Sequence, residues 1–396
     1  MEKVAKSKEV MKKFLEEYNV DRKTEIVPLD EALNRVLAED ILSKVTIPMV
    51  RASMLDGIAV CSSMFENGIP DTSNWTLGCE YVRADTGDDF DDKYDSIIRI
   101  EDVSFDENNK LHINPDIKVT PGCLTKKAGS SLKYGEFILG KNVKLIPTDL
   151  AAIAMAGMTE VSVYKKPIVG FIPTGSELIA VGEEVTRGKN IDSNSVLAKF
   201  MLKEMGADVI NYPIVKDDFK LLEQALNKAL SECDIVILNG GSSKGEEDFN
   251  ARLLKSRGKI YCHWTTRAPG RPLCLAMIDN KPVINVPGPA IGAFNALNWC
   301  INPIVNKFLG VPNVAKQKIT GIITKDLECW GDAEFLSMMD VKKEGDQYYI
   351  TPLNFRTMNL ARCMSANAMY VFELGGKSFK KGDLIEVELL RDIEYL

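Results

Sequence analysis

The chain has 396 residues, more than one ordinary hydrophobic core holds, so we expect two to four domains. Hydrophobic residues make up 45% and charged residues 27%, which is typical of a soluble globular protein. The formal net charge is −7 and no stripe of lysine and arginine occurs, which argues against a nucleic-acid-binding protein.

No apolar stretch reaches the length of a transmembrane helix, and the first twenty residues lack the apolar core of a signal peptide. The nine cysteines occur singly, which favours a reducing, cytoplasmic location over a disulfide framework or a zinc cluster. His112 and His263 are the only histidines. Any chemistry must therefore rely mainly on carboxylates, hydroxyls, lysines, arginines or a bound metal.

Apolar side chains recur at helical spacing over residues 10–18 and predict an amphipathic N-terminal helix. Residues 28–42 predict a second helix, with Asp30 as its N-cap. Three side chains are expected to face inward from it: Leu33, Val36 and Leu37.

The secondary-structure pattern of the sequence then changes twice. Residues 60–142 hold short β-prone runs and predict a β-rich module, in which the acidic stretch 85–95 must be a loop. Residues 150–310 alternate between strand and helix patterns, which implies a parallel sheet covered by helices on both faces. The segments after residue 312 predict a small all-β module.

Several polar turns follow the predicted strands of the alternating region, where open α/β sheets bind their ligands. They are PTGSEL (173–178), KDD (216–218), NGGSSKGEED (239–248) and VPGPA (286–290), with RAPGRP (267–272) between the last two. Glycines allow close backbone approach to an anion, while Glu177, Asp217 and Asp248 supply oxygens. The simplest joint interpretation is a phosphorylated ligand bridged to the protein by Mg²⁺.

Each turn also has an ordinary structural explanation. Thr174 or Ser176 could simply cap a helix, and Asp217 and Asp218 are more often helix caps than ligands. The GGSSKG stretch is not a Walker A loop, because Lys244 is followed by glycine. The clustering of several such turns at one sheet edge therefore carries more weight than any single turn.

Taken together, these stretches resemble the motifs of the molybdopterin molybdenumtransferase family, the MoeA-type molybdenum insertases, which includes the E domain of gephyrin. The resemblance spans nearly the whole chain, in the family's order. It rests on the turns above and on PMVRASMLDGIAV (48–60), TG (86–87), DSIIRIE (95–101), IDSNS (191–195) and MSANAMYV (364–371).

The resemblance implies a multidomain α/β and β protein. Its centre is a three-layer α/β molybdopterin-binding fold with a mixed, mostly parallel sheet. The implied domains are the N-terminal part of an elongated linker (1–45), an inserted β-rich domain with return to the linker (46–140), the α/β domain (141–310) and a C-terminal β-barrel (311–396). It also implies a homodimer. The site would lie between one subunit's α/β domain and the other subunit's Asp56 and Thr86 segments.

The implied activity is transfer of molybdenum from molybdate into adenylylated molybdopterin, with Mg²⁺ as cofactor and release of AMP. The resemblance suggests a small-molecule substrate and other cofactor-biosynthesis proteins as partners, with no nucleic acid or membrane. The implied catalytic residues are Asp56, Glu177, Asp217, Asp248 and Arg271, of which the four carboxylates would also bind the metal. The implied substrate-binding residues are Thr86, Gly87, Thr174, Gly175, Gly240, Gly241, Ser243, Lys244, Gly245, Arg267, Pro287 and Gly288.

The sequence departs from the family pattern at several of these positions. Two lysines of the family's K-P-G-K-P motif are replaced by Ala268 and Arg271, and an aspartate of its G-E-D-I segment is replaced by Ser131. Other departures are Ile58, Ser176, Pro289 and Ala290. Three alternatives stay open: an insertase, including one that prefers tungstate; a non-catalytic molybdopterin-binding carrier, sensor or scaffold; and an adenylyltransferase, which the full chain length disfavours.

Overall fold

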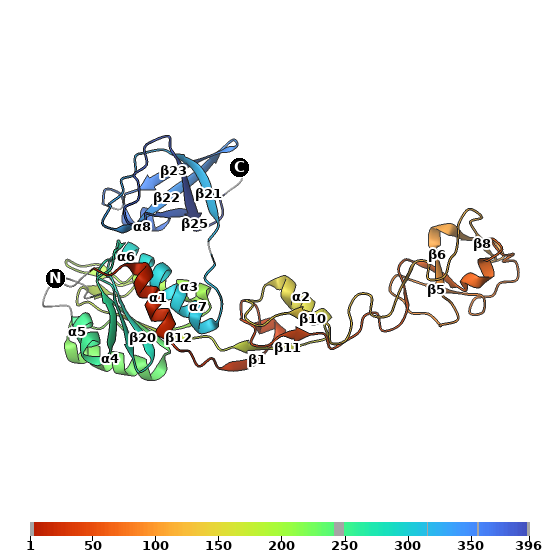
Figure 1. Ribbon diagram of the computed structural model, residues 1–396, viewed down its shortest axis with the longest axis horizontal. Coiled ribbons are helices and arrows are strands. Elements are labelled where there is room, and N and C mark those ends of the chain that lie inside the picture. The colour runs from red at the N-terminus through yellow and green to blue at the C-terminus, as the bar shows by residue number, and fades with distance from the viewer. Residues whose placement is uncertain (1–3, 241–248, 315, 355, 394–396) are drawn as a thin grey trace. The chain divides into compact units, whose positions relative to one another are not determined.

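The computed structural model describes residues 4–240, 249–314, 316–354 and 356–393. The chain divides into two compact units, one formed by Met1–Thr24 with Tyr164–Leu396 and the other by Glu25–Val163 (Figure 1). We call them unit 1 and unit 2. Unit 2 is thus a single insertion into the chain of unit 1.

Unit 1 contains a six-stranded sheet with the strand order β15-β12-β16-β20-β19-β17. The strands are β12 (Ile168–Pro173), β15 (Asp208–Asn211), β16 (Ile235–Asn239), β17 (Lys259–His263), β19 (Cys274–Ile278) and β20 (Lys281–Val286). The first four strands in this order are parallel, and β19 and β17 are antiparallel additions at the edge. The predicted mixed, mostly parallel sheet is therefore confirmed.

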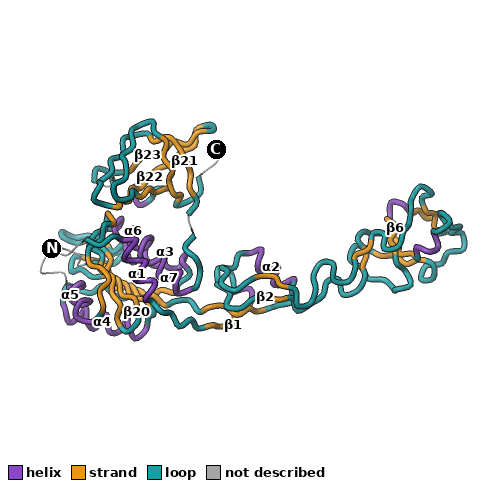
Figure 2. The backbone as a smooth tube through the Cα atoms, in the orientation of Figure 1, coloured by secondary structure: helices purple, strands orange, loops and turns teal. Residues whose placement is uncertain are grey.

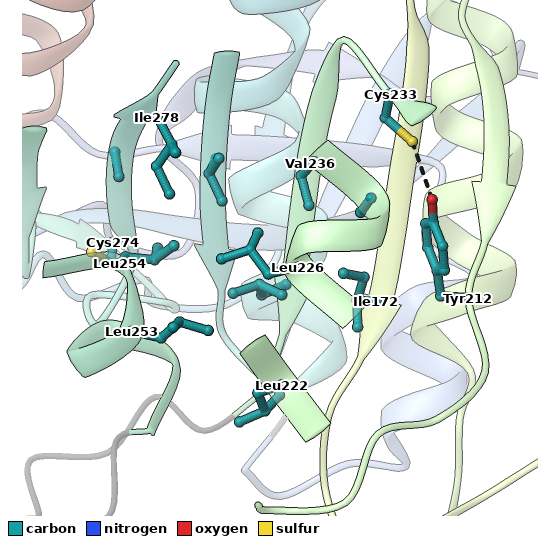
Figure 3. Close-up of a cluster of buried hydrophobic side chains, with 14 residues drawn as sticks. Ile172, Tyr212, Leu222, Leu226, Cys233, Val236, Leu253, Leu254, Cys274 and Ile278 are labelled. Atoms are coloured by element: carbon teal, nitrogen blue, oxygen red, sulfur yellow. Dashed lines mark hydrogen bonds between the residues drawn. The ribbon is translucent and has the colours of Figure 1, made fainter. Parts of the chain in front are cut away.

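Helices cover both faces of this sheet (Figure 1). They are α1 (Ser7–Glu17), α3 (Asn194–Met205), α4 (Phe219–Glu232), α5 (Phe249–Arg257), α6 (Ala290–Ala296) and α7 (Asn302–Leu309). Figure 3 shows the core between the sheet and α4 and α5, where Leu222 and Leu226 meet Ile172 and Val236. Adjacent strand residues point to opposite faces, so Ile237 points toward the face that α3 and α6 cover. The predicted helix over 10–18 is confirmed as α1.

The helical segment between residues 290 and 309 is interrupted. A π-helical turn, Leu297–Ile301, separates α6 from α7. Pro303 lies in the first turn of α7 and has no N–H to donate. This missing donor explains why the regular α-helical hydrogen bonding breaks at that point.

The rest of unit 1 is a small barrel. Its strands are β21 (Lys318–Ile323), β22 (Glu334–Glu344), β23 (Gln347–Leu353), β24 (Ala368–Val371) and β25 (Leu384–Leu389), with helix α8 (Leu360–Met364) before β24. They follow the order β22-β23-β21-β25-β24, and pairing of β24 with β22 closes the barrel. The C-terminal β module predicted from the sequence is thus confirmed. Strand β18 (Arg267–Ala268) pairs with β22 and links the barrel to the α/β part.

Unit 2 consists mainly of short strands and loops (Figure 2). Its strands are β1 (Thr24–Pro28), β2 (Ile41–Leu42), β3 (Ala52–Ser53), β4 (Gly57–Val60), β5 (Tyr81–Ala84), β6 (Ser96–Arg99), β7 (Val103–Phe105), β8 (Leu111–Ile113), β9 (Thr125–Lys126), β10 (Phe137–Leu139) and β11 (Glu160–Tyr164), with helix α2 (Pro147–Met155). The predicted β-rich texture is confirmed. The domain boundaries drawn from the family resemblance stay a prediction.

The second N-terminal helix predicted over residues 28–42 is wrong. Only a single 3₁₀ turn, Leu29–Glu31, forms there. Asn34 has φ +63°, which ends helical geometry. Val36 and Leu37 are buried as expected, but through bridges to Lys144 and Val163, whereas Leu33 is exposed. The apolar spacing therefore predicted burial correctly for Val36 and Leu37 but not for Leu33, and it predicted the wrong backbone conformation.

Among the residues that the structure describes, no helix is long and apolar enough to cross a membrane.

Candidate functional site

The carboxyl ends of β12, β16 and β20 meet at one edge of the sheet, as their parallel registers require. Thr174, Gly240 and Pro287 follow these strands directly. The N–H of Thr174 donates to Asn239 O at 2.8 Å, and the N–H of Gly240 donates to Val286 O at 3.2 Å. Backbone hydrogen bonds thus hold the three turns together.

The close approach of these turns requires glycine. Gly240 has φ +128°, and a Cβ there would lie 2.2 Å from the carbonyl oxygen of Thr174. Gly175 has φ +151°, and a Cβ there would lie 2.5 Å from Oε2 of Glu177. Both N–H groups donate within the protein, that of Gly175 to Val215 O at 3.0 Å and that of Gly240 to Val286 O at 3.2 Å, so these glycines serve the close packing of the turns.

A cavity of about 500 Å³ opens beside the turns. Its lining comprises Thr174, Glu177, Leu178, Asn190, Ile191, Asp192, Ser193, Asn194, Asn239, Gly240, Gly288, Pro289, Ala290 and Leu360. A second cavity of about 530 Å³ shares Leu178 and Asp192 with it and reaches Gly175, Ser176 and Lys216. Both volumes lie in the range of small-molecule sites.

A network of buried asparagines supports the floor of the first cavity. Nδ2 of Asn194 donates to Asn239 Oδ1 at 3.0 Å and to Gly288 O at 2.6 Å. Nδ2 of Asn239 in turn donates to Pro287 O at 2.9 Å. The network therefore connects the start of α3 to the turns after β16 and β20.

Asn250 extends this network from the first turn of α5. Its Nδ2 lies 3.0 Å from Thr174 Oγ1, 3.0 Å from Gly240 O and 3.0 Å from Asn285 Oδ1. Asn250 is 1% exposed and Asn285 is fully buried. One side-chain amide thus joins the ends of all three parallel strands.

The described carboxylates make different contacts. Asp217 Oδ2 accepts a hydrogen bond of 2.9 Å from the N–H of Ser176, so it braces the TGSE turn. Asp218 accepts from Leu221 N and is the N-cap of α4, which confirms the capping interpretation for this residue. The side chain of Glu177 is exposed and lies against Gly175. Asp192 is buried and accepts from the N–H and hydroxyl of Ser195.

Mg²⁺ prefers one or two carboxylates together with substrate phosphates. Glu177 and Asp217 flank the Gly175–Ser176 turn with hard oxygen donors, so the donor chemistry fits Mg²⁺. Among the described ranges, no group of three or more histidine, cysteine or acidic side chains could hold a metal by itself. A metal here would therefore need oxygens from a ligand or from further carboxylates.

Arg271 and Arg267, which the resemblance implies as catalytic and substrate-binding residues, both contact other protein groups. Arg271 pairs with Asp332, with 2.8 Å between Nη2 and Oδ2, and also donates to the carbonyl oxygen of Asp332. Arg267 donates through Nε to Asn295 Oδ1 at 3.1 Å, and burial lowers the pKa of its guanidinium.

In unit 2, Asp56 and Thr86 are brought together as the sequence predicted. Asp56 Oδ1 accepts from the hydroxyl of Thr86 at 2.8 Å and from its N–H at 2.7 Å. These two hydrogen bonds, the hydroxyl first, hold the pKa of Asp56 below its ordinary value. Gly87 follows with φ +95°. The pair therefore presents an ionised carboxylate on an exposed turn.

Five predicted site residues lie outside the described residues: Gly241, Ser243, Lys244, Gly245 and Asp248. Conversely, sequence reasoning did not assign site roles to Asp192, Asn194, Asn239, Asn250 and Asn285. A polar side chain at the end of an apolar strand, such as Asn239 after Ile235–Leu238, is the one local signal that could have pointed to them.

Two family models match the chain. Residues 4–157 match the "MoeA N-terminal region (domain I and II)", and residues 177–307 match the "Probable molybdopterin binding domain". The chain is thus a multidomain protein built around a molybdopterin-binding-type α/β domain.

Full-length relatives agree with this class. The chain is 27% identical to the molybdopterin molybdenumtransferase of Haemophilus influenzae over 391 residues, 95% of this chain and 96% of that protein. It is also 27% identical to that of Staphylococcus epidermidis over 400 residues, 96% and 94% of the two chains. The solved molybdopterin biosynthesis MoeA protein of Pyrococcus horikoshii matches with TM-score 0.82 and 23% identity over 98% of this chain and 100% of that chain. Over nearly its whole length the chain is thus similar to MoeA-type molybdopterin molybdenumtransferases.

Proposed function

We propose that this protein is a transferase that inserts molybdenum from molybdate into adenylylated molybdopterin, with release of AMP and dependence on Mg²⁺. Matches to molybdopterin molybdenumtransferases over nearly the whole chain support a role in molybdenum cofactor biosynthesis. The observation that carries the proposal is the meeting of three strand-end turns around one cavity of about 500 Å³ beside Glu177.

In this proposal the substrate's pyrophosphate lies against the turns at Thr174, Gly240 and Gly288. The turn at Gly240 approaches Thr174 closely, because a Cβ at Gly240 would lie 2.2 Å from Thr174 O. The asparagine network fixes the spacing of the turns, so that the anion meets donors already in place. Lys244 and Ser243 add the donors that the family resemblance implies.

Glu177, Asp217 and Asp248 would hold Mg²⁺, together with Asp56 contributed by a second subunit of a homodimer. When bound, the metal would neutralise charge on the phosphoanhydride and so favour its cleavage. Asp217 also keeps the TGSE turn in shape through the N–H of Ser176. Thr86 keeps the Asp56 carboxylate ionised and oriented.

A second candidate function is binding of molybdopterin or its nucleotide without insertion, as a carrier, sensor or scaffold. The arginine contacts favour it: Arg271 is paired with Asp332, and Arg267 is buried against Asn295. An oxyanion would have to displace Asp332 to reach the Arg271 guanidinium.

The test is AMP release from adenylylated molybdopterin by the purified protein with Mg²⁺, with and without molybdate or tungstate. Glu177→Gln removes a proposed metal ligand, and Glu184→Gln is the matched control on an exposed nearby glutamate. We expect oxyanion-dependent release by the wild type and the control, and its loss in Glu177→Gln. Substrate binding without release under either oxyanion would refute the insertase and leave the binding protein.

A further inference from the structure

The barrel of unit 1 contains a separate cavity of about 530 Å³. It shares no lining residue with the two cavities beside the strand-end turns. Its apolar lining comprises Leu327, Trp330, Phe335, Pro352, Leu353 and Met358. The mixture of this apolar lining with polar groups resembles a ligand site more than a packing defect.

An aromatic wall forms one side of the cavity. The ring centroids of Trp330 and Phe335 lie 4.5 Å apart at an interplanar angle of 39°. Trp330 is 36% exposed, although it is one of the largest apolar side chains available to a core. Exposed indole surface in a cavity suits a flat ring, which gains stacking energy without needing a defined hydrogen-bond pattern.

Two cations stand at the same cavity. The guanidinium of Arg356 lies 4.5 Å from the centroid of the Trp330 ring, and Lys325 also lines the cavity. Neither has a carboxylate partner among residues the structure describes. Asn354 accepts from the N–H of Arg356 at 2.9 Å and so fixes the turn that carries the arginine.

The acids of the cavity do not neutralise these cations. Asp326 pairs with Lys380 at 2.9 Å and accepts from the N–H of Lys381. Glu328 also lines the cavity and makes no ion pair with the residues that the structure describes. The two cations Lys325 and Arg356 therefore outnumber the one unpaired carboxylate, which leaves positive charge for a ligand.

A buried hydroxyl completes the donor set. Ser337 lines the cavity and is only 5% exposed. A buried hydroxyl facing a cavity can donate to an anionic oxygen or accept from a ring N–H.

We propose that this cavity of the barrel binds a planar aromatic ring that carries a phosphate or carboxylate, as a small-molecule site distinct from the molybdopterin site. The ring would pack against Trp330 and Phe335. The anionic group would meet Arg356, whose planar fork suits oxyanions, and Lys325. This inference does not rest on the proposed function.

Isothermal titration calorimetry on the full-length protein tests it, with AMP as the probe. Adenosine keeps the ring without the charge, and ribose 5-phosphate keeps the charge without the ring. Pocket variants are Trp330→Ala and Arg356→Gln; Arg391→Gln is the matched control on an exposed arginine of the same unit.

We expect AMP affinity to fall about tenfold or more in each pocket variant, the usual scale for losing a charge-assisted hydrogen bond or a base stack. The affinity should be unchanged in Arg391→Gln, and both AMP fragments should bind weakly. Far-UV circular dichroism checks that each variant is folded. The proposal is overturned by absence of AMP binding, by binding that survives both pocket variants, or by equal binding of adenosine.

Discussion

Replacing Asn250 with leucine tests the asparagine network most directly. Leucine has the same branching and the same number of side-chain heavy atoms as asparagine, so the substitution removes the amide without opening a large hole. It leaves Gly240 O and Asn285 Oδ1, each 3.0 Å from Nδ2 of Asn250, without that donor in a site that is 1% exposed. Losing the partner of a buried acceptor costs about 1–3 kcal/mol, so we expect roughly 2–4 kcal/mol for the pair.

Native-state hydrogen exchange with mass spectrometry is the suitable assay, because a multidomain chain does not unfold in one step. Peptides that cover β16 and β20 should exchange on the order of 30- to 1000-fold faster. This factor is the expected loss of stability converted into a change of the opening equilibrium constant. Asn306→Ala is the matched control, since Asn306 makes an exposed amide hydrogen bond to Asn313 on the surface of unit 1. Equal exchange in the two variants would refute the view that Asn250 holds the strand ends together.

Three further predictions concern single contacts. Gly240→Ala should prevent the turn from closing, because its Cβ would lie 2.2 Å from Thr174 O, and binding of molybdopterin, measured by fluorescence, should be lost. Thr86→Val should raise the pKa of Asp56 toward its ordinary value, because the Thr86 hydroxyl is the largest cause of the lowered pKa; a carboxyl NMR titration measures this. In the wild type, the stabilisation from this contact is fully present above the unfolded-state pKa of Asp56. It is lost as the pH falls through the folded-state pKa. Asp218→Ala should destabilise α4 by about 1 kcal/mol in hydrogen exchange, the usual cost of losing an N-cap. Retained molybdopterin binding in Gly240→Ala, an unchanged Asp56 pKa in Thr86→Val, or unchanged exchange of α4 in Asp218→Ala would contradict the corresponding expectation.

Hydrophobic periodicity predicted much of the α/β fold because it is a local signal that tertiary packing reinforces. The α4 pattern, with Leu222 and Leu226 on one face, is buried as expected. The antiparallel strands β17 and β19 were not predicted, because neither shows a helical or alternating period, and β19 is an uninterrupted apolar run. The failed helix over 28–42 has the opposite cause: a helical period was present, but bridges to residues far along the chain determined the backbone.

The candidate site was predictable only in part, for a related reason. Turns rich in glycine and acids are visible as motifs, and the pairing of Asp56 with Thr86 followed from the family pattern. The asparagine network has no such signature. Asn194, Asn250 and Asn285 are ordinary residues in sequence, and only the parallel registers bring them to one point.

The contacts of Arg271 bear on the choice between insertase and binding protein. The ion pair with Asp332 would keep an oxyanion away from the Arg271 guanidinium only if the pair contributed a large free energy. Asp332 has a side chain 76% exposed, and water and salt screen such a pair heavily. A phosphate or molybdate carries two charges and offers Arg271 the same fork of oxygens. A substrate anion can therefore replace Asp332 at little cost, so the pair lowers anion affinity without abolishing it, and the insertase remains the better-supported function.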